Sequence, residues 1–298
     1  MTIVLLRVIE ILFPMFSVVL LGYYCSRRTG IDMAPINRLN LDYFAPAFVF
    51  SVLVDMPLGS RQINLIYAGL LALLVPGILM WVVCKIKNLD IRIWLPSHMF
   101  RNSGNLAIPL FVYTFGQIAK GDAVLLLVIS STLQMTLGLF IVSGANKAGL
   151  KLLFRAPLIY ATALALFFNL NGITVWPPLQ QATELIGASN IPLMLFSLGT
   201  QLVYVNRSGL KIGLISTATS LITGAITFLI IQSVVELPLR ELQMMVLFTM
   251  LPPAVMNYLF AERYKVGGET VAAMVLYGNF FAIFTMPVLL WFALSVVK

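Results

Sequence analysis

Charged residues, histidines and cysteines are scarce in this chain. Asp, Glu, Lys and Arg make up 10% of its 298 residues, whereas a soluble domain carries roughly a quarter. His98 is the single histidine and is expected in a cytoplasmic loop. Neither a CxxC nor an HExxH motif occurs, so the sequence predicts no metal site and no cofactor. Cys25 and Cys84 lie near the ends of apolar stretches, where we expect free thiols on the cytoplasmic side. An intramembrane enzyme or a sensor is a remote alternative, because intramembrane hydrolysis needs paired aspartates, a Ser–His pair or a metal-binding helix, and the chain has one histidine and no aspartate pair within its spans.

Apolar residues are abundant instead. They make up 60% of the chain, and the mean hydropathy is +0.97. Most apolar stretches reach the ~20 residues that a membrane span needs. They are, approximately, residues 5–25, 36–57, 62–85, 92–115, 121–144, 156–171, 181–204, 209–233, 240–263 and 269–296. The sequence therefore predicts an all-α integral membrane protein of ten transmembrane helices, with the lipid bilayer as its surroundings and no soluble domain.

Basic residues indicate how the chain is oriented. The loop after the first span and the other loops on its side hold most of them: Arg27, Arg28, Arg38, Lys85, Lys87, Arg92, Arg101, Lys147, Lys151, Arg155, Arg207, Lys211, Arg263 and Lys265. The opposite side holds Arg7, Arg61, Lys120, Arg240 and Lys298. The positive-inside rule places the richer side in the cytoplasm and both termini outside. Because the basic residues are spread over short loops, the net charge of +8 does not indicate nucleic-acid binding.

The two halves of the chain repeat. Pro46 in the second span and Pro192 in the seventh each begin a Pro-x3-Phe-Ser pattern, and 192 − 46 gives an offset of 146 residues. The same offset brings Gly77 beside Gly224, and Pro109 beside the Pro252–Pro253 pair. Because five spans is an odd number, the second repeat enters the membrane inverted. We expect a first repeat over 1–144, a cytoplasmic linker over 145–155 and a second repeat over 156–298.

The fourth and ninth spans carry similar interruptions. The fourth contains Asn102-Ser103-Gly104-Asn105 before Pro109, and the ninth contains Pro252-Pro253 before Asn257. Proline removes an amide donor and frees carbonyl groups within a helix, and in a membrane those groups need new partners. Gly104 allows unusual backbone angles, and the Asn and Ser side chains can replace lost backbone partners. Paired broken helices at matching places in two halves indicate the substrate site of a transporter.

Each interruption predicts a half-helix that begins at or near a proline. Pro109 suits the first turn of such a half-helix, and Pro252-Pro253 are expected to do the same. The free amides and partial positive charge of a half-helix N-terminus suit a carboxylate. Two crossing half-helices would then bind an organic anion without a fixed charge. The alternative is that these prolines only kink their helices.

Other polar residues leave their roles open. Ser131 and Gln134, in the fifth span, share a helix face and either complete the solute site or bridge helices. Glu10, Asp42 and Glu184 lie near span ends, where each is either solvated or binds a coupling proton.

The two interruptions carry a family resemblance over the whole chain. Arg101-Asn102-Ser103-Gly104-Asn105 running into Ile108-Pro109-Leu110 resembles the fourth-span motif of the auxin efflux carrier family. Leu251-Pro252-Pro253-Ala254-Val255-Met256-Asn257-Tyr258 resembles its ninth-span motif. The resemblance implies two inverted five-span repeats, with spans 1, 2, 6 and 7 as a scaffold and spans 3–5 and 8–10 as a transport domain. It also implies kinship in fold with the sodium–bile acid symporters.

The resemblance also implies a role for particular residues. In the plant PIN carriers an asparagine seven residues before the fourth-span proline binds the substrate carboxylate, and Asn102 stands at that position. The long loop between spans 5 and 6 of many plant carriers is absent, which favours a bacterial protein of the inner membrane. The predicted substrate-binding residues are Asn102, Ser103, Gly104, Asn105, Pro109, Ser131, Gln134, Pro252, Pro253 and Asn257.

The function that the sequence predicts is secondary transport of small organic anions, such as malate or other mono- and dicarboxylates. An elevator-type movement would carry the crossing of spans 4 and 9 across the membrane. A sodium- or proton-coupled symporter is the alternative, although neither interruption holds an acidic residue. The substrate, the coupling ion and the direction of transport stay open, as does assembly into a homodimer.

Overall fold

The computed structural model describes residues 2–144, 156–204 and 209–297, and the linker predicted over 145–155 lies outside them. These described residues are helical, apart from short connections and one isolated β-bridge. The first half contains α1 (Thr2–Thr29), α2 (Ala34–Leu39), η1 (Asn40–Phe44), α3 (Ala45–Leu53), α4 (Ser60–Lys87), α5 (Ile91–Met99), η2 (Ser103–Ala107), α6 (Ile108–Phe115), η3 (Gln117–Ala119), α7 (Lys120–Leu133), η4 (Gln134–Gly138) and α8 (Leu139–Val142). The second half contains α10 (Pro157–Leu170), α11 (Pro177–Ala188), α12 (Asn190–Gln201), η6 (Leu202–Tyr204), α13 (Leu210–Val234), α14 (Leu239–Thr249), α15 (Val255–Tyr264) and α16 (Gly268–Ser295).

Six helical stretches among the described residues are long and apolar enough to cross a membrane. They are Leu6–Thr29, Ser60–Lys87, Gln117–Val142, Pro177–Tyr204, Leu210–Val234 and Gly268–Ser295. The other four predicted spans are not single long helices. The second is divided among α2, η1 and α3, the sixth is the 14-residue α10, and the fourth and ninth are each interrupted.

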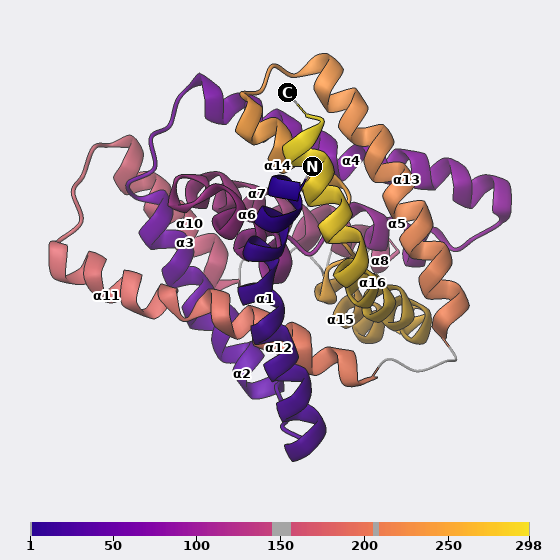
Figure 1. The fold of residues 1–298 in the computed structure, drawn as a ribbon. Coiled ribbons are helices and arrows are strands. Elements are labelled where there is room, and N and C mark those ends of the chain that lie inside the picture. The colour runs from indigo at the N-terminus through magenta and orange to yellow at the C-terminus, as the bar shows by residue number, and fades with distance from the viewer. Residues whose placement is uncertain (1, 145–155, 205–208, 298) are drawn as a thin grey trace.

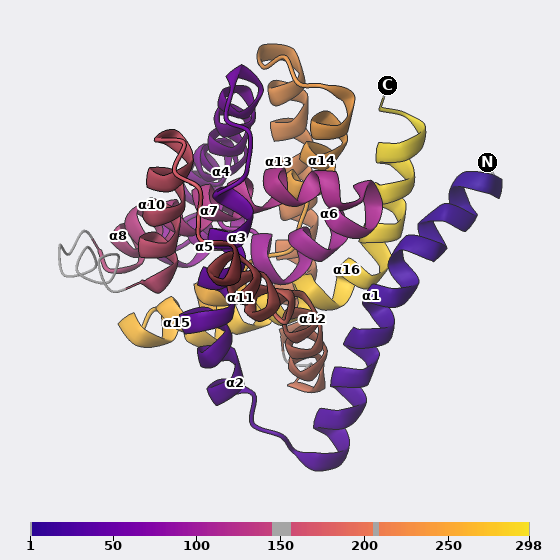
Figure 2. The ribbon, with the colours of Figure 1, turned by 90° about the vertical axis from the view of Figure 1, so that its left-hand side faces the viewer.

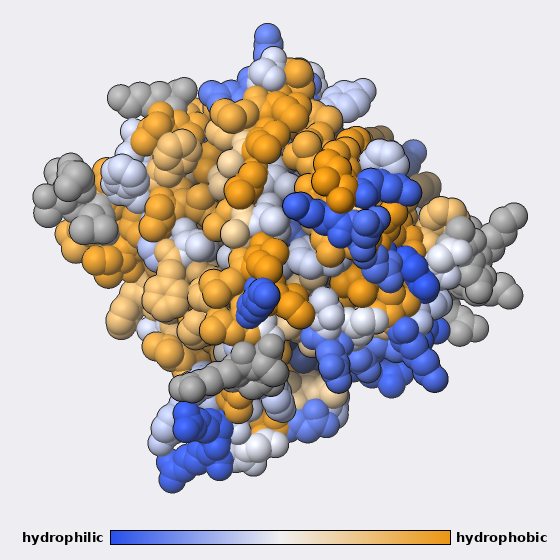
Figure 3. Space-filling view, turned by 90° about the vertical axis from the view of Figure 1, so that its right-hand side faces the viewer, coloured by the Kyte–Doolittle hydropathy of each residue, from blue (hydrophilic) through white to orange (hydrophobic). Residues whose placement is uncertain are grey.

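The ends of the helices alternate between two sides of the molecule. The start of α1 and the end of α16 lie close together, and the connection between α13 and α14 lies at the same end (Figures 1 and 2). The connection between α1 and α2 lies at the opposite end (Figure 2). Hydrophobic residues cover much of the face drawn in Figure 3, and hydrophilic residues lie at its top, at its bottom and in a band on its right-hand side. This surface is suited to contact with lipid.

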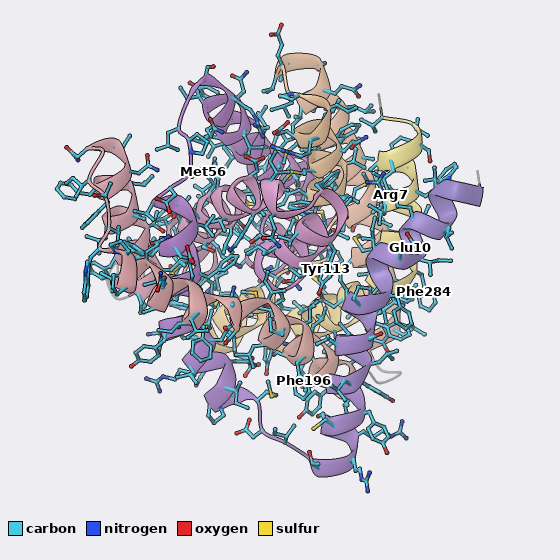
Figure 4. The ribbon with its side chains drawn as sticks, turned by 60° about the vertical axis from the view of Figure 1, so that its left-hand side comes forward. Arg7, Glu10, Met56, Tyr113, Phe196 and Phe284 are labelled. Carbon is cyan, nitrogen blue, oxygen red and sulfur yellow. The ribbon has the colours of Figure 1, made fainter. Side chains whose placement is uncertain are left out.

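Small residues bring α1 and α12 into close contact. Gly22 of α1 faces the backbone of Phe196, whose position on α12 Figure 4 shows. Gly199 of α12 faces the backbone of α1, where an added Cβ would lie 2.9 Å from the Tyr23 nitrogen and would overlap the Val19 carbonyl oxygen. Because apolar burial gives little advantage between helices in lipid, such backbone contacts are a main source of helix association.

The matched glycines Gly77 and Gly224 have equivalent surroundings. Gly77 of α4 faces the end of α5, and an added Cβ would lie 2.7 Å from the Met99 Cγ. Gly224 of α13 faces the end of α14, where an added Cβ would lie 2.8 Å from the Met250 Cγ. Each glycine therefore lets the first half of an interrupted helix approach its neighbour.

We expect Gly199→Ala to lower stability by about 1–3 kcal/mol, because the new methyl group would push α1 and α12 apart. The melting temperature Tm of the purified protein in detergent measures this effect. Gly59→Ala is the control, since a Cβ there meets only the Gln62 Oε1, at 3.7 Å. Equal Tm values for the two variants would contradict the expectation.

Candidate functional site

The two helix interruptions cross each other and pair through their backbones. The Asn102 amide donates to the Pro252 carbonyl oxygen at 2.8 Å, and the Ala254 amide donates to the Phe100 carbonyl oxygen at 2.9 Å. These bonds flank an antiparallel bridge between Arg101 and Pro253. Backbone groups that each broken helix leaves without an intrahelical partner are thus satisfied by the other, as a membrane interior requires.

Asparagine and glutamine side chains hold this crossing on both sides. Asn102 Nδ2 donates to Asn279 Oδ1 at 2.8 Å, and Asn102 Oδ1 caps η2 by accepting from the Asn105 amide at 3.2 Å. Asn257 Nδ2 donates to the Phe100 carbonyl oxygen at 2.9 Å, while its Oδ1 accepts from Gln134 Nε2 at 2.8 Å. The crossing is therefore fixed to α16 through Asn279 and to η4 through Gln134.

A cavity of about 170 Å³ lies beside the crossing. Its lining includes Asn102–Asn105, at the start of the half-helix formed by η2 and α6, and Ala254–Met256, at the start of α15. Ser131 and Gln134 also line it. The first turns of both half-helices thus meet at one small space, where their partial positive charges add.

Four of the predicted site residues do not line the cavity. Pro109 occupies the first turn of α6 as predicted. Pro252 and Pro253 lie in the extended segment before α15, which begins at Val255, so the prediction that they start this helix is wrong. Their carbonyl oxygens accept hydrogen bonds at the crossing. Asn257 is 1% exposed, and its Oδ1 accepts a hydrogen bond from the Gln134 side chain.

Three expectations about the fourth span are corrected by the structure. Arg101 is not in a cytoplasmic loop, since its side chain is wholly buried at the crossing. The crossing therefore carries a fixed positive charge. His98 is also buried, in α5, and its Nε2 lies 2.8 Å from the Thr219 Oγ1 of α13. Gly104 has no positive φ, and its role is close packing, because an added Cβ would lie 3.3 Å from the Met194 Cε.

Sequence reasoning missed the wall of the cavity opposite the crossing. Asn37 of α2, Asn40 of η1, and Met194 and Ser197 of α12 line that wall. Ser197 belongs to the repeated Pro-x3-Phe-Ser pattern. That pattern indicated matching helices in the two halves of the chain, but it did not indicate which of their side chains face the cavity. Asn40 Oδ1 and Ser197 Oγ are buried and lack a hydrogen-bond partner.

Larger pockets lie on the two sides of the cavity. One of about 590 Å³ includes Asp32, after α1, and shares Asn37, Gln201, Val255 and Leu259 with the cavity lining. On the opposite side, a pocket of about 440 Å³ shares no lining residue with the cavity. The cavity therefore adjoins the pocket on the side that holds the connection after α1.

None of the three acidic residues considered for proton binding lines the cavity. Glu10 is exposed on α1 (Figure 4). Asp42 forms an exposed ion pair with Arg38 at 3.5 Å. Glu184 accepts a hydrogen bond from Gln180 at 3.1 Å and lines the 440 Å³ pocket.

A partly buried ion-pair cluster lies at the end of the molecule where α4, α7 and α14 begin, with buried carboxylates and more exposed arginines. Asp122 accepts from Arg61 at 2.9 Å and from Arg240 at 2.8 Å. Glu241 pairs with the same two arginines, at 2.9 Å from Arg240. Since Arg61 and Asp122 belong to the first half of the chain, this cluster joins the two halves away from the crossing.

The chain is similar to known membrane transport proteins. A family model described as "Membrane transport protein" matches residues 140–290. The chain is 24% identical over 307 aligned residues to the uncharacterized transporter YfdV of Escherichia coli K12, covering 95% of this chain and 96% of the relative. The YfdV proteins of Escherichia coli O157:H7 and Shigella flexneri match equally.

Replacing Asn257 tests how the crossing is supported. We expect Asn257→Ala to cost about 1–3 kcal/mol and so to lower Tm by several degrees, because it leaves the buried Gln134 amide group without its partner and removes one of the two hydrogen bonds that the Phe100 carbonyl accepts. Asn64→Ala is the matched control, because Asn64 Nδ2 also donates to a backbone carbonyl, that of Glu236, but at an exposed position. If both variants melt alike, Asn257 does not hold the crossing.

Proposed function

Because the chain belongs to the membrane transport protein family, that of the auxin efflux carriers, whose members are transporters and not enzymes, we propose that it is a secondary transporter of small organic anions. The substrate carboxylate binds in the cavity beside the crossing. The observation that carries this proposal is that the first turns of both half-helices line this one small space. Free amides and helix dipoles at such ends favour an anion.

The composition of the cavity wall supports a carboxylate substrate. Its polar lining residues carry amide or hydroxyl side chains, apart from the cationic Arg101, and none of its lining residues is acidic. Asn102 keeps a second N–H that can donate to a carboxylate while the first remains bonded to Asn279. The volume of about 170 Å³ suits a small mono- or dicarboxylate, such as malate.

Ten spans in two inverted repeats are part of the proposal. Its support is the order of elements, because each half has a long helix followed by an interrupted one directly before its last span. Gly77 and Gly224 occupy equivalent places in these halves. The positive-inside rule then places the first connection in the cytoplasm and both termini outside.

Alternating access follows from such a repeat. We assign α1, α2–α3, α10 and α11–α12 to a scaffold and the remaining helices to a transport domain that moves as an elevator. Ser197 lines the cavity on the cytoplasmic side, whereas its repeat counterpart Ser51 lines the 440 Å³ pocket on the other side. Since the cavity shares lining residues only with the pocket on the cytoplasmic side, we assign this conformation to an inward-facing carrier.

Coupling to sodium or protons is the second candidate. The buried oxygen atoms without partners at Asn40 and Ser197 leave room for an additional bound group. A sodium site normally uses several oxygen ligands, often with a carboxylate, and no acidic residue lines the cavity. We therefore favour transport without a coupling ion.

Charge movement in proteoliposomes on a solid-supported membrane tests the transport function. We expect a current for at least one of malate, malonate, oxalate, lactate and indole-acetate, unchanged when sodium is removed. Asn102→Ala should reduce that current at least tenfold, because it removes both the helix cap and the amide donor.

Asn171→Ala is the control variant, since Asn171 only donates to the Phe167 carbonyl at the exposed end of α10. Its current should equal that of the wild type. A current that persists in Asn102→Ala would contradict the assigned site. The absence of both current and radiotracer flux for every acid would contradict the substrate class.

A further inference from the structure

Arg101 is a buried cation without an acidic partner. Its side chain is 0% exposed, and none of the salt bridges among the described residues includes it. Its Nη1 donates to the Ser220 hydroxyl and, at 3.3 Å, to the Leu251 carbonyl oxygen, while Nη2 donates to the Ser220 carbonyl oxygen at 3.4 Å. The guanidinium is therefore stabilised by neutral oxygen atoms alone.

These oxygen atoms form the kind of site that would suit a small inorganic cation. Leu251 lies just past the C-terminal end of α14, where carbonyl groups without helical partners carry partial negative charge. In transporters with broken helices, such C-terminal ends and unwound carbonyls coordinate sodium or receive protons. Backbone carbonyls and a hydroxyl are also hard oxygen ligands, and here they would hold such a cation without the carboxylate that many cation sites include.

We propose that Arg101 replaces a coupling cation. Its guanidinium permanently occupies the oxygen site formed by Ser220 and Leu251 at the end of α14, so that the crossing is assembled without a bound ion. This inference deepens the proposed function, because it explains why that function needs no sodium, and its transport consequence rests on it.

The position of Arg101 links this site to the substrate cavity. Its own backbone bridges to Pro253, and the next residue, Asn102, donates to Pro252 and lines the cavity. The guanidinium reaches α13, while the Asn102 side chain reaches α16. The cation at the oxygen site therefore determines the position of the first turn of the η2–α6 half-helix, where the anion binds.

Buried ionisable residues in membrane proteins commonly have a functional role. If Arg101 replaces a cation, variants without its guanidinium should behave in a specific way. Removing the guanidinium should leave an oxygen-lined space that sodium can enter. A purely structural arginine would instead leave a defect that no particular cation repairs.

Thermal unfolding of the purified protein in NaCl and in N-methyl-D-glucamine chloride tests this inference. We expect the wild type and Arg101→Lys to melt at the same temperature in both salts, because each keeps a cation on the oxygen atoms. Arg101→Ser should be destabilised without sodium, and its Tm should rise by roughly 5 °C in NaCl. If this variant aggregates without sodium, NaCl should restore a monodisperse protein.

Arg92→Ser is the matched control. Arg92 also directs its guanidinium to a carbonyl oxygen, that of Val142, at 2.6 and 2.8 Å, but away from the crossing. We expect its Tm to be the same in both salts. The inference is overturned if Arg101→Ser melts alike in both salts or aggregates in both, or if the wild type is itself stabilised by sodium.

The unfolding measurement needs no transported acid, so it is independent of the proposed function. If an acid gives a current with the wild type, Arg101→Ser should carry it only in sodium. If no acid gives a current but Arg101→Ser alone responds to sodium in unfolding, the proposed substrate class fails while the assignment of Arg101 stands.

Discussion

The pairing of two helix interruptions through their backbones is the constraint on which the rest of this structure depends. Neither segment could leave its amides and carbonyls unpaired inside a membrane, and each supplies the other with partners at Asn102, Pro252, Phe100 and Ala254. Such pairing requires close approach. At Gly278 of α16, an added Cβ would lie only 2.7 Å from the Pro253 Cδ. Small residues around the crossing therefore follow from the backbone pairing.

The crossing also divides the site electrostatically. The helix N-termini lie toward the cavity, which Asn102 and Arg101 both line. The guanidinium of Arg101 is bonded on the other side, to Ser220 of α13 and to the Leu251 carbonyl just past the end of α14. An anion and a fixed cation can thus be held on two sides of one short backbone segment. Because a membrane interior screens charge poorly, the two charges remain coupled even though different atoms bind them.

The partly buried ion-pair cluster is a second attachment between the two halves of the chain. Arg61 and Asp122 come from the first half, and Arg240 and Glu241 from the second. Buried ion pairs contribute little net stability compared with apolar packing, but removing one partner is strongly unfavourable. The cluster is therefore better suited to fixing the relative position of α4, α7 and α14 than to stabilising the protein. Together with the crossing, it would let these helices move as one body.

The sequence could predict a feature where residues close to it in the chain determine it, and could not where tertiary packing determines it. The interruptions at Asn102–Pro109 and Pro252–Pro253 were predicted because proline and asparagine act on their own backbone, and the structure has both. Arg101 was predicted in a cytoplasmic loop because the positive-inside rule assigns basic residues to loops. Nothing in the neighbouring sequence shows that the helix interruption beside it places this residue in the protein interior. Asn40 and Ser197 were missed since they reach the cavity only through tertiary packing. A basic residue directly beside a predicted membrane interruption is therefore better treated as a buried site residue than as a topology signal.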